Sequence, residues 1–153
     1  MTREEIRQAV EFFLDVVLGD LPVDEREENL YLALDRLALA IHFADYIFDE
    51  TDYPEVLLRD YAALREIVVR NFPNLGLYNV VLDINENIGA GEVAVGDAID
   101  DICDITGEME EVIWCWENTS VDDALWHFKE MYRTHWGRHL RDLQSYLFEK
   151  LYF

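Results

Sequence analysis

Two histidines near the C-terminus have a spacing that suits metal binding. His135 and His139 stand four positions apart in the run His-Trp-Gly-Arg-His. Residues four apart lie on one face of a helix, so two imidazoles at this spacing can reach one ion. Trp136 stands where a zinc-protease helix has its glutamate, which excludes that class of enzyme. The pair predicts a metal site, a core histidine held by one hydrogen bond, or a general acid or base.

The apolar pattern of this segment places the two rings differently. His139 falls within the predicted apolar stripe and His135 lies at its edge, so we expect one buried ring and one half-exposed ring. A buried histidine needs a polar partner, and the candidates are Asp45, Tyr146 and the edge of the acidic helix described next. Gly137 is unfavourable in mid helix, so we expect another group to pack closely against it.

A stripe of carboxylates is the second group that could do chemistry. Its members are Asp97, Asp101, Asp104, Glu108 and Glu111. Spacings of four and three place these residues on one side of a helix. Like charges this close repel, so a metal ion or the arginine of a partner would stabilise them. The centre of the apolar face lies about 140° around the helix from the carboxylates, so we expect the stripe to face solvent.

An outward acidic stripe favours binding of a basic protein. Trp114 lies away from the inner face of the same helix, and a half-exposed tryptophan beside carboxylates is typical of a binding hot spot. No Lys or Arg occurs between Arg70 and Lys129, so this surface would be uniformly negative. We therefore expect the five carboxylates and Trp114 to bind a basic partner, as an immunity protein, an antitoxin or a regulator does.

The composition limits the classes of function. The 153 residues include 33 acids and 12 bases, giving a net charge of -21, and such a field repels the phosphates of nucleic acid. With 51% apolar residues, the chain can form one domain over residues 1–153. The N-terminus lacks the apolar core of a signal peptide and no run is long enough to cross a bilayer, so we expect a cytoplasmic protein without membrane contact. Cys103 and Cys115, twelve positions apart on one helix, cannot pair.

Helical patterns account for most of the chain. The predicted helices cover residues 2–19, 22–48, 52–73 and 97–118, and a fifth runs from Ser120 through Leu147 toward the end. Thr2 with Glu5 predicts a capping box, Pro54 suits a first helical turn, and Asp97 and Ser120 are predicted N-caps.

Residues 74–96 interrupt the helical pattern. The first part reads as extended or irregular, and the glycines that follow are typical of a flexible surface loop. The alternative is a small hairpin from Leu77 to Val95. Five helices with short connections predict an all-α antiparallel bundle.

The chain resembles a family of short bacterial helical proteins known only as a domain of unknown function. The residues that carry the resemblance are Tyr78-Asn79-Val80-Val81-Leu82-Asp83, Gly96-Asp97, Asp100-Asp101, Asp104-Ile105, Trp126, Phe128 and His135-Trp136-Gly137 with His139. The resemblance implies an all-helical fold and no particular activity. It also groups the aspartate segment with the histidine segment. Carboxylates and imidazoles together are the ligand set of a zinc, iron or manganese site.

Three hypotheses about function remain open from the sequence. The one it favours is a non-catalytic acidic protein that binds a basic partner. The first alternative is a metal-binding protein or metalloenzyme, a hydrolase or an oxidase, with His135, His139, Asp101 and Asp104 as ligands. The second is a structural module that dimerises through an apolar helix face. The oligomeric state, monomer or homodimer, is open as well.

Overall fold

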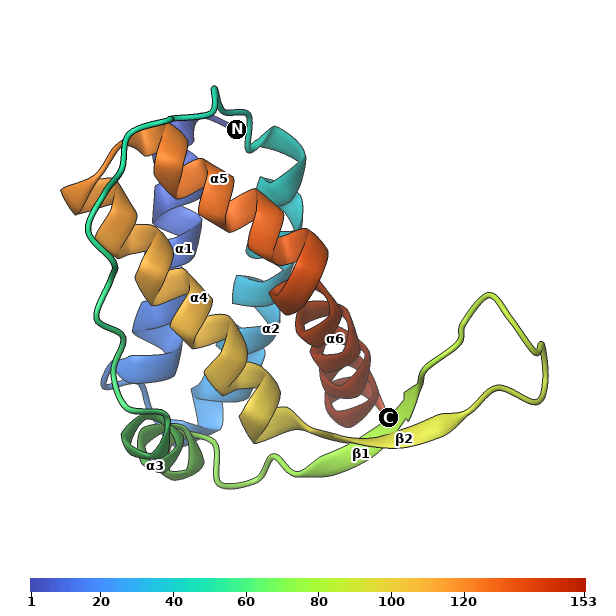
Figure 1. Cartoon of the computed structure of the whole chain (residues 1–153). Helices are drawn as coiled ribbons and strands as arrows, with labels where there is room; N and C mark the ends of the chain where they lie inside the picture. Colours follow the sequence, from blue (N-terminus) through green and yellow to red (C-terminus); the bar gives the residue numbers. More distant parts are fainter.

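Helix α4 (Ala98–Asn118) is the central element of the structure. In the computed structural model, which describes all of residues 1–153, this helix contacts four other helices and the hairpin (Figure 1). The other helices are α1 (Arg3–Leu18), α2 (Val23–Ala40), α3 (Tyr61–Asn71), α5 (Val121–Met131) and α6 (Gly137–Tyr152). Helix α2 packs against α1 and α6 on the far side of the bundle. The predicted all-α fold is confirmed.

One hydrophobic core of 33 buried residues receives side chains from all six helices. Its largest fully buried members are Trp136, Phe13, Phe72 and Phe128. The predicted N-caps are confirmed for three helices. Thr2 and Glu5 form the capping box of α1, Asp97 accepts from the backbone of Ile99, and Ser120 accepts from that of Asp123.

The segment between α2 and α3 is an extended strap, where the sequence pattern predicted helix. Helix α2 ends at Ala40, a 3₁₀ turn, η1 (Ile41–Phe43), follows, and residues 44–60 run along the outside of α4 (Figure 1). The predicted helix through Phe48 is wrong because long-range bonds hold the strap. The backbone of Ile47 donates to Asp122, and Ser120 donates to Asp49 at 2.5 Å.

The predicted start of the third helix is wrong as well. Helix α3 begins at Tyr61, and Asp60, not Asp52, is its N-cap, with its side chain accepting from Ala63 at 3.1 Å. Leu57, which lies in the segment predicted to be helix, is almost fully exposed. The strap carries several like charges that oppose a helix, and Pro54 tolerates an extended backbone.

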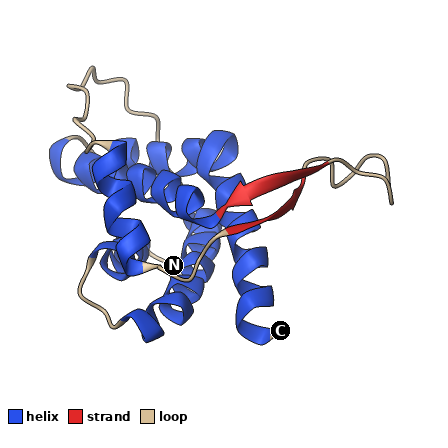
Figure 2. Cartoon of the chain, turned by 90° about the horizontal axis from the view of Figure 1, so that it is seen from below, coloured by secondary structure: helices blue, strands red, loops and turns tan.

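The alternative of a hairpin between the third and fourth helices is correct. Strands β1 (Leu77–Val81) and β2 (Val93–Asp97) pair antiparallel, with Leu77 opposite Asp97 and Val81 opposite Val93. The hairpin projects from one end of the bundle, as seen in Figure 2. None of the helices combines the length and the apolar character needed to span a bilayer.

A buried arginine joins the end of α1 to α2. The side chain of Arg26 is almost fully buried, and its guanidinium donates to the carbonyl oxygens of Val16, Gly19 and Leu21 at 2.6–2.7 Å. These carbonyls lie at or beyond the last turn of α1, where backbone acceptors lack helical partners. The positive charge also lies at the negative end of the helix dipole.

We expect Arg26→Met to lower the free energy of unfolding by about 2–4 kcal/mol, because it leaves three carbonyl groups without their charged donor while keeping the side-chain volume. Urea unfolding of both proteins measures the difference. Arg36→Met is the control, since Arg36 is exposed on the same helix and contacts only the ring of Phe12 among the described interactions. Equal losses in the two variants would contradict this role of Arg26.

Candidate metal centre

The predicted fifth helix is divided by a π-helical turn, η2 (Tyr132–Trp136), between α5 and α6. The backbone of Gly137 donates to Tyr132, five residues earlier, and the indole of buried Trp136 donates to the carbonyl of Phe128 at 3.1 Å. A Cβ atom on Gly137 would collide with the carbonyl and ring of Tyr132. The predicted close packing against Gly137 is therefore confirmed. Such π-turns are frequent at functional sites.

The prediction that the carboxylate stripe faces solvent is wrong. Asp97 faces α3, and the other four carboxylates face α5, η2 and α6. Asp101 is only 6% exposed, and Asp104, Glu108 and Glu111 are partly buried. The projection assumed that α4 has one buried face. As the central helix it is covered on several sides, so its polar stripe also becomes an interface. Trp114, predicted half exposed, is partly buried.

Every carboxylate of the stripe has a basic partner within the chain. Asp97 accepts from Arg65 at 2.9 Å, and Glu111 lies 3.5 Å from the Nδ1 of His127. The three between them, Asp101, Asp104 and Glu108, face His135 and His139. A basic partner that bound this stripe would have to compete for carboxylates that already pair with basic side chains of the same chain.

Asp104, His135 and His139 converge on one point. A carboxylate oxygen of Asp104, Oδ2, lies 3.2 Å from the Nε2 of His139 and 3.9 Å from the Nε2 of His135. One donor atom from each of the three lies within 4.8 Å of the others. Two ligands of a tetrahedral zinc ion, each about 2.0–2.1 Å from it, are about 3.4 Å apart. The observed separations suit a shared ion after small side-chain movements.

A second carboxylate holds the other nitrogen of each ring. Glu108 Oε1 lies 2.6 Å from the Nδ1 of His135, and Asp101 Oδ1 lies 2.7 Å from the Nδ1 of His139. Metal-binding histidines commonly donate their second N–H to a carboxylate, which fixes the ring and the tautomer. In the tautomer with Nδ1–H donating in this way, Nε2 of each ring carries the lone pair and lies 3.2 Å (His139) or 3.9 Å (His135) from Oδ2 of Asp104. Of the candidate partners for His139, the acidic helix is the correct one.

Two of these groups have pKa values displaced from the ordinary range. The hydrogen bond with Asp101 raises the pKa of His139, against the effect of burial. Burial, followed by the charge of Asp100, raises the pKa of Asp104, which the two histidines oppose. The protonation of His139 is thus linked to the carboxylates on α4.

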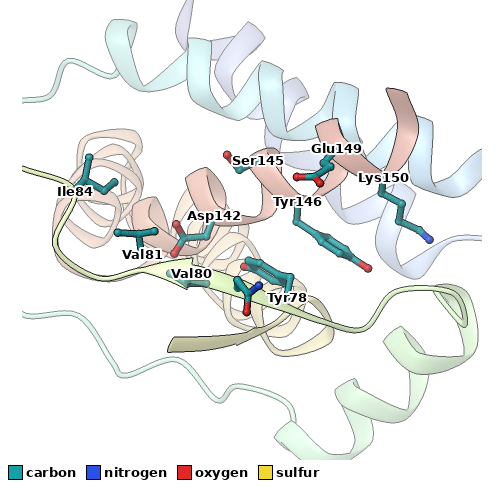
Figure 3. Close-up of a pocket in the computed structure, with 10 residues that line it drawn as sticks. Tyr78, Val80, Val81, Ile84, Asp142, Ser145, Tyr146, Glu149 and Lys150 are labelled. Atoms are coloured by element: carbon teal, nitrogen blue, oxygen red, sulfur yellow. The ribbon is translucent and has the colours of Figure 1, made fainter. Parts of the chain in front are cut away.

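The hairpin contacts the site through a hydrogen bond from Tyr78 to Asp101. The hydroxyl of Tyr78 on β1 donates to Oδ2 of Asp101, and burial raises the pKa of Tyr78, so the phenol stays protonated as a donor. The ring of Tyr78 stacks on Tyr146 of α6 at 4.8 Å between centroids. Both rings line a cavity of about 630 Å³ between β1 and α6. Figure 3 shows the side chains of its wall. Neither three-donor cluster of the chain lines that cavity.

A smaller cavity adjoins the proposed ligands themselves. It has a volume of about 220 Å³ and is lined by the end of the strap, α3, α4 and His135. Asp104 and Glu108 lie in its wall, together with the apolar side chains of Leu58 and Leu64. Gly107 contributes no side chain, and a Cβ there would meet no atom within 4 Å. A small molecule can therefore approach Asp104 and His135 from this side.

Sequence reasoning missed several members of this region. Nothing in the local pattern of Tyr78 shows that it reaches Asp101, because that contact depends on how the hairpin folds back. His127 is partly buried beside Glu111. Its position eight residues before His135 in the same predicted helix was the available signal.

The comparisons with known proteins identify a family. The family described as Domain of unknown function (DUF5063) matches residues 29–152. The chain belongs to the DUF5063 family. The resemblance to a domain of unknown function is thus confirmed, and DUF5063 itself carries no assigned activity. No curated protein matches the chain in sequence.

A solved structure similar to this DUF5063 chain is that of protein BF1032 from Bacteroides fragilis. The two share 17% sequence identity with a TM-score of 0.76, over 97% of this chain and 91% of the other. At this identity the similarity shows the fold alone. The overall fold is therefore found in an experimental structure of a distant sequence.

We expect Gly137→Ala to lower the free energy of unfolding by about 1–3 kcal/mol, because its methyl group forces apart the π-turn that orients both histidines. Gly107→Ala is the control, since it lies in mid helix in open space and should stabilise α4 by up to about 1 kcal/mol. Thermal or urea unfolding of both variants measures the two effects. Similar changes in the two would contradict a constrained π-turn.

Proposed function

We propose that this protein binds a divalent transition-metal ion, zinc or iron(II), through Asp104, His135 and His139. The observation that supports the proposal is the convergence of two imidazole Nε2 atoms on one carboxylate while separate carboxylates hold both Nδ1 atoms. A core histidine needs one hydrogen-bond partner, whereas each of these rings has carboxylates at both nitrogens. Two histidines and one carboxylate are the ligand set of catalytic zinc and of non-haem iron sites.

The surroundings favour a cation at this point. Asp100, Asp101 and Asp104 lie within one turn of α4, and a net charge of -21 raises the local concentration of cations. An ion would stabilise the ionised form of Asp104, whose pKa is raised by burial and then by the charge of Asp100. Manganese, the third metal of the sequence-based prediction, prefers a larger share of oxygen ligands than this set offers.

Three protein ligands leave coordination positions free, and the cavity beside Asp104 and His135 gives them access. When bound, a zinc or iron ion would supply activation of water or of dioxygen at those positions. The protein side chains would hold the ion, fix the two rings and present a partly apolar wall to a small substrate. We therefore infer a small-molecule metalloenzyme, a hydrolase or an oxidase.

The binding of a basic partner, favoured by the sequence, stays a prediction. The predicted binding surface is less suited to a partner, because Asp101, Asp104 and Glu108 contact histidines of the same chain. Charge reversal of these residues would now disturb the bundle as well as any partner surface. The dimeric module and the cytoplasmic location likewise stay predictions.

Elemental analysis of protein purified without an affinity tag tests the proposal. We expect at least one equivalent of zinc or iron per wild-type chain, and one equivalent less in His139→Ala and in Asp104→Asn, because each loses a ligand. His42→Ala is the control, since His42 is exposed and belongs to no donor cluster. Metal-free wild-type protein that still fails to bind added Zn²⁺ or Fe²⁺ would contradict the proposal. Full occupancy in folded His139→Ala would do the same.

We expect Glu108→Gln to weaken Zn²⁺ binding about 10–100-fold, because it removes the charge that holds Nδ1 of His135 without removing a ligand. Competition against a chelator of known affinity measures the change. Glu110→Gln is the control, because Glu110 is a close neighbour on α4 that pairs with Arg59 at 2.8 Å. If both variants bind zinc as tightly as the wild type, Glu108 does not support the centre.

A further inference from the structure

A second cluster of metal-donor side chains lies at the other end of the same interface. Cys115, in the last turn of α4, meets Asp123 and His127 from the first two turns of α5, and one donor atom from each lies within 4.8 Å of the others. We propose that Cys115, Asp123 and His127 form a second, separate metal site that takes zinc or another borderline-soft divalent ion. This proposal stands independently of the His135 and His139 centre.

The tight connection between α4 and α5 orients these three side chains in advance. The hydroxyl of Thr119 lies 2.7 Å from both the carbonyl oxygen of Cys115 and Oδ2 of Asp123. Ser120 caps α5 by accepting from the backbone of Asp123 at 3.1 Å. Asp123 and His127 are four apart on α5, so they lie on one face toward Cys115. The geometry is thus set by backbone elements and not by flexible loops.

An ion can reach this cluster from solvent. Cys115 is only 2% exposed, but it lines a cavity of about 460 Å³ together with Asp123 and His127. The outer wall of that cavity is the strap, from Thr51 to Leu58. Glu111 lies in the same cavity, 3.5 Å from the Nδ1 of His127, where it can orient that ring as Glu108 orients His135.

The donor types select the ion. A thiolate with an imidazole and a carboxylate suits zinc and other borderline-soft ions, whereas magnesium and calcium take oxygen ligands. The alternative role for a cysteine beside a histidine is nucleophilic catalysis. Cys115 is buried beside the carboxylates of Asp123 and Glu111, and no Lys or Arg lines its cavity, so these surroundings do not favour a reactive free thiolate.

The two clusters cannot share one ion. Asp104 and Cys115 are eleven positions apart on one continuous helix, which separates them by about 16 Å at a rise of about 1.5 Å per residue. Paired catalytic metals lie only about 3.5–4 Å apart. The chain would therefore hold two independent ions along the face that α4 presents to α5, η2 and α6.

Cobalt(II) titration of the tag-free, reduced protein tests this site, because only a thiolate ligand produces a sulfur-to-cobalt charge-transfer band in the near ultraviolet. We expect the band in the wild type, its loss together with one equivalent of bound cobalt in Cys115→Ser, and its weakening in His127→Gln. Cys103→Ser is the matched control, since Cys103 is equally buried on the same helix and belongs to neither cluster. His139→Ala should keep the band, which separates this site from the first.

Three results would overturn the second site. These are the absence of the band in wild-type protein that contains free thiols, its survival in Cys115→Ser, and its loss in Cys103→Ser. Circular dichroism shows whether each variant folds. If Cys115→Ser does not fold, Asp123→Asn with His127→Gln takes its place, and an unchanged band in that folded double variant overturns the proposal.

Discussion

The pairing of α4 carboxylates with imidazoles across the bundle is the interaction on which this structure depends. Asp101, Asp104 and Glu108 approach His135 and His139 at 2.6–3.9 Å in a partly buried interface. Five acidic side chains on one stripe of a helix would repel one another without such partners. The same pairing that allows α4 to lie at the centre of the bundle also gathers nitrogen and oxygen donors at one point. Stability and the proposed chemistry therefore share one set of residues.

The elements around α4 serve this arrangement in different ways. The π-turn at Tyr132–Trp136 sets the directions of the two rings, and Gly137 makes its close packing sterically allowed. The hairpin supplies Tyr78, whose phenol donates a hydrogen bond to Asp101. The strap crosses the open side, where it lines the cavities beside both donor clusters. An acidic interface covered by an irregular segment is costly to maintain for stability alone, and the proposed metal binding would give it a physical reason.

The sequence predicted helices well where one apolar face was enough to define them. The capping residues Thr2, Asp97 and Ser120 and the all-α class are correct, because those signals are local. The strap was missed because its conformation depends on bonds to Asp122 and Ser120, about 75 and 71 residues away. The orientation of α4 was missed because a helical projection assumes one buried face, and α4 has several neighbours. The sequence grouped four candidate ligands, His135, His139, Asp101 and Asp104. Their convergence depends on the orientation of α4, which only the structure shows.

Diffraction from crystals grown with Zn²⁺ and measured at the zinc absorption edge tests the central claim most directly. The account predicts an anomalous peak about 2.0–2.2 Å from the Nε2 atoms of His135 and His139 and from a carboxylate oxygen of Asp104, with Glu108 and Asp101 still bound to the Nδ1 atoms. A map without a peak at that point, in which both rings still bridge pairs of carboxylates, would contradict it and leave a purely structural ion-pair network.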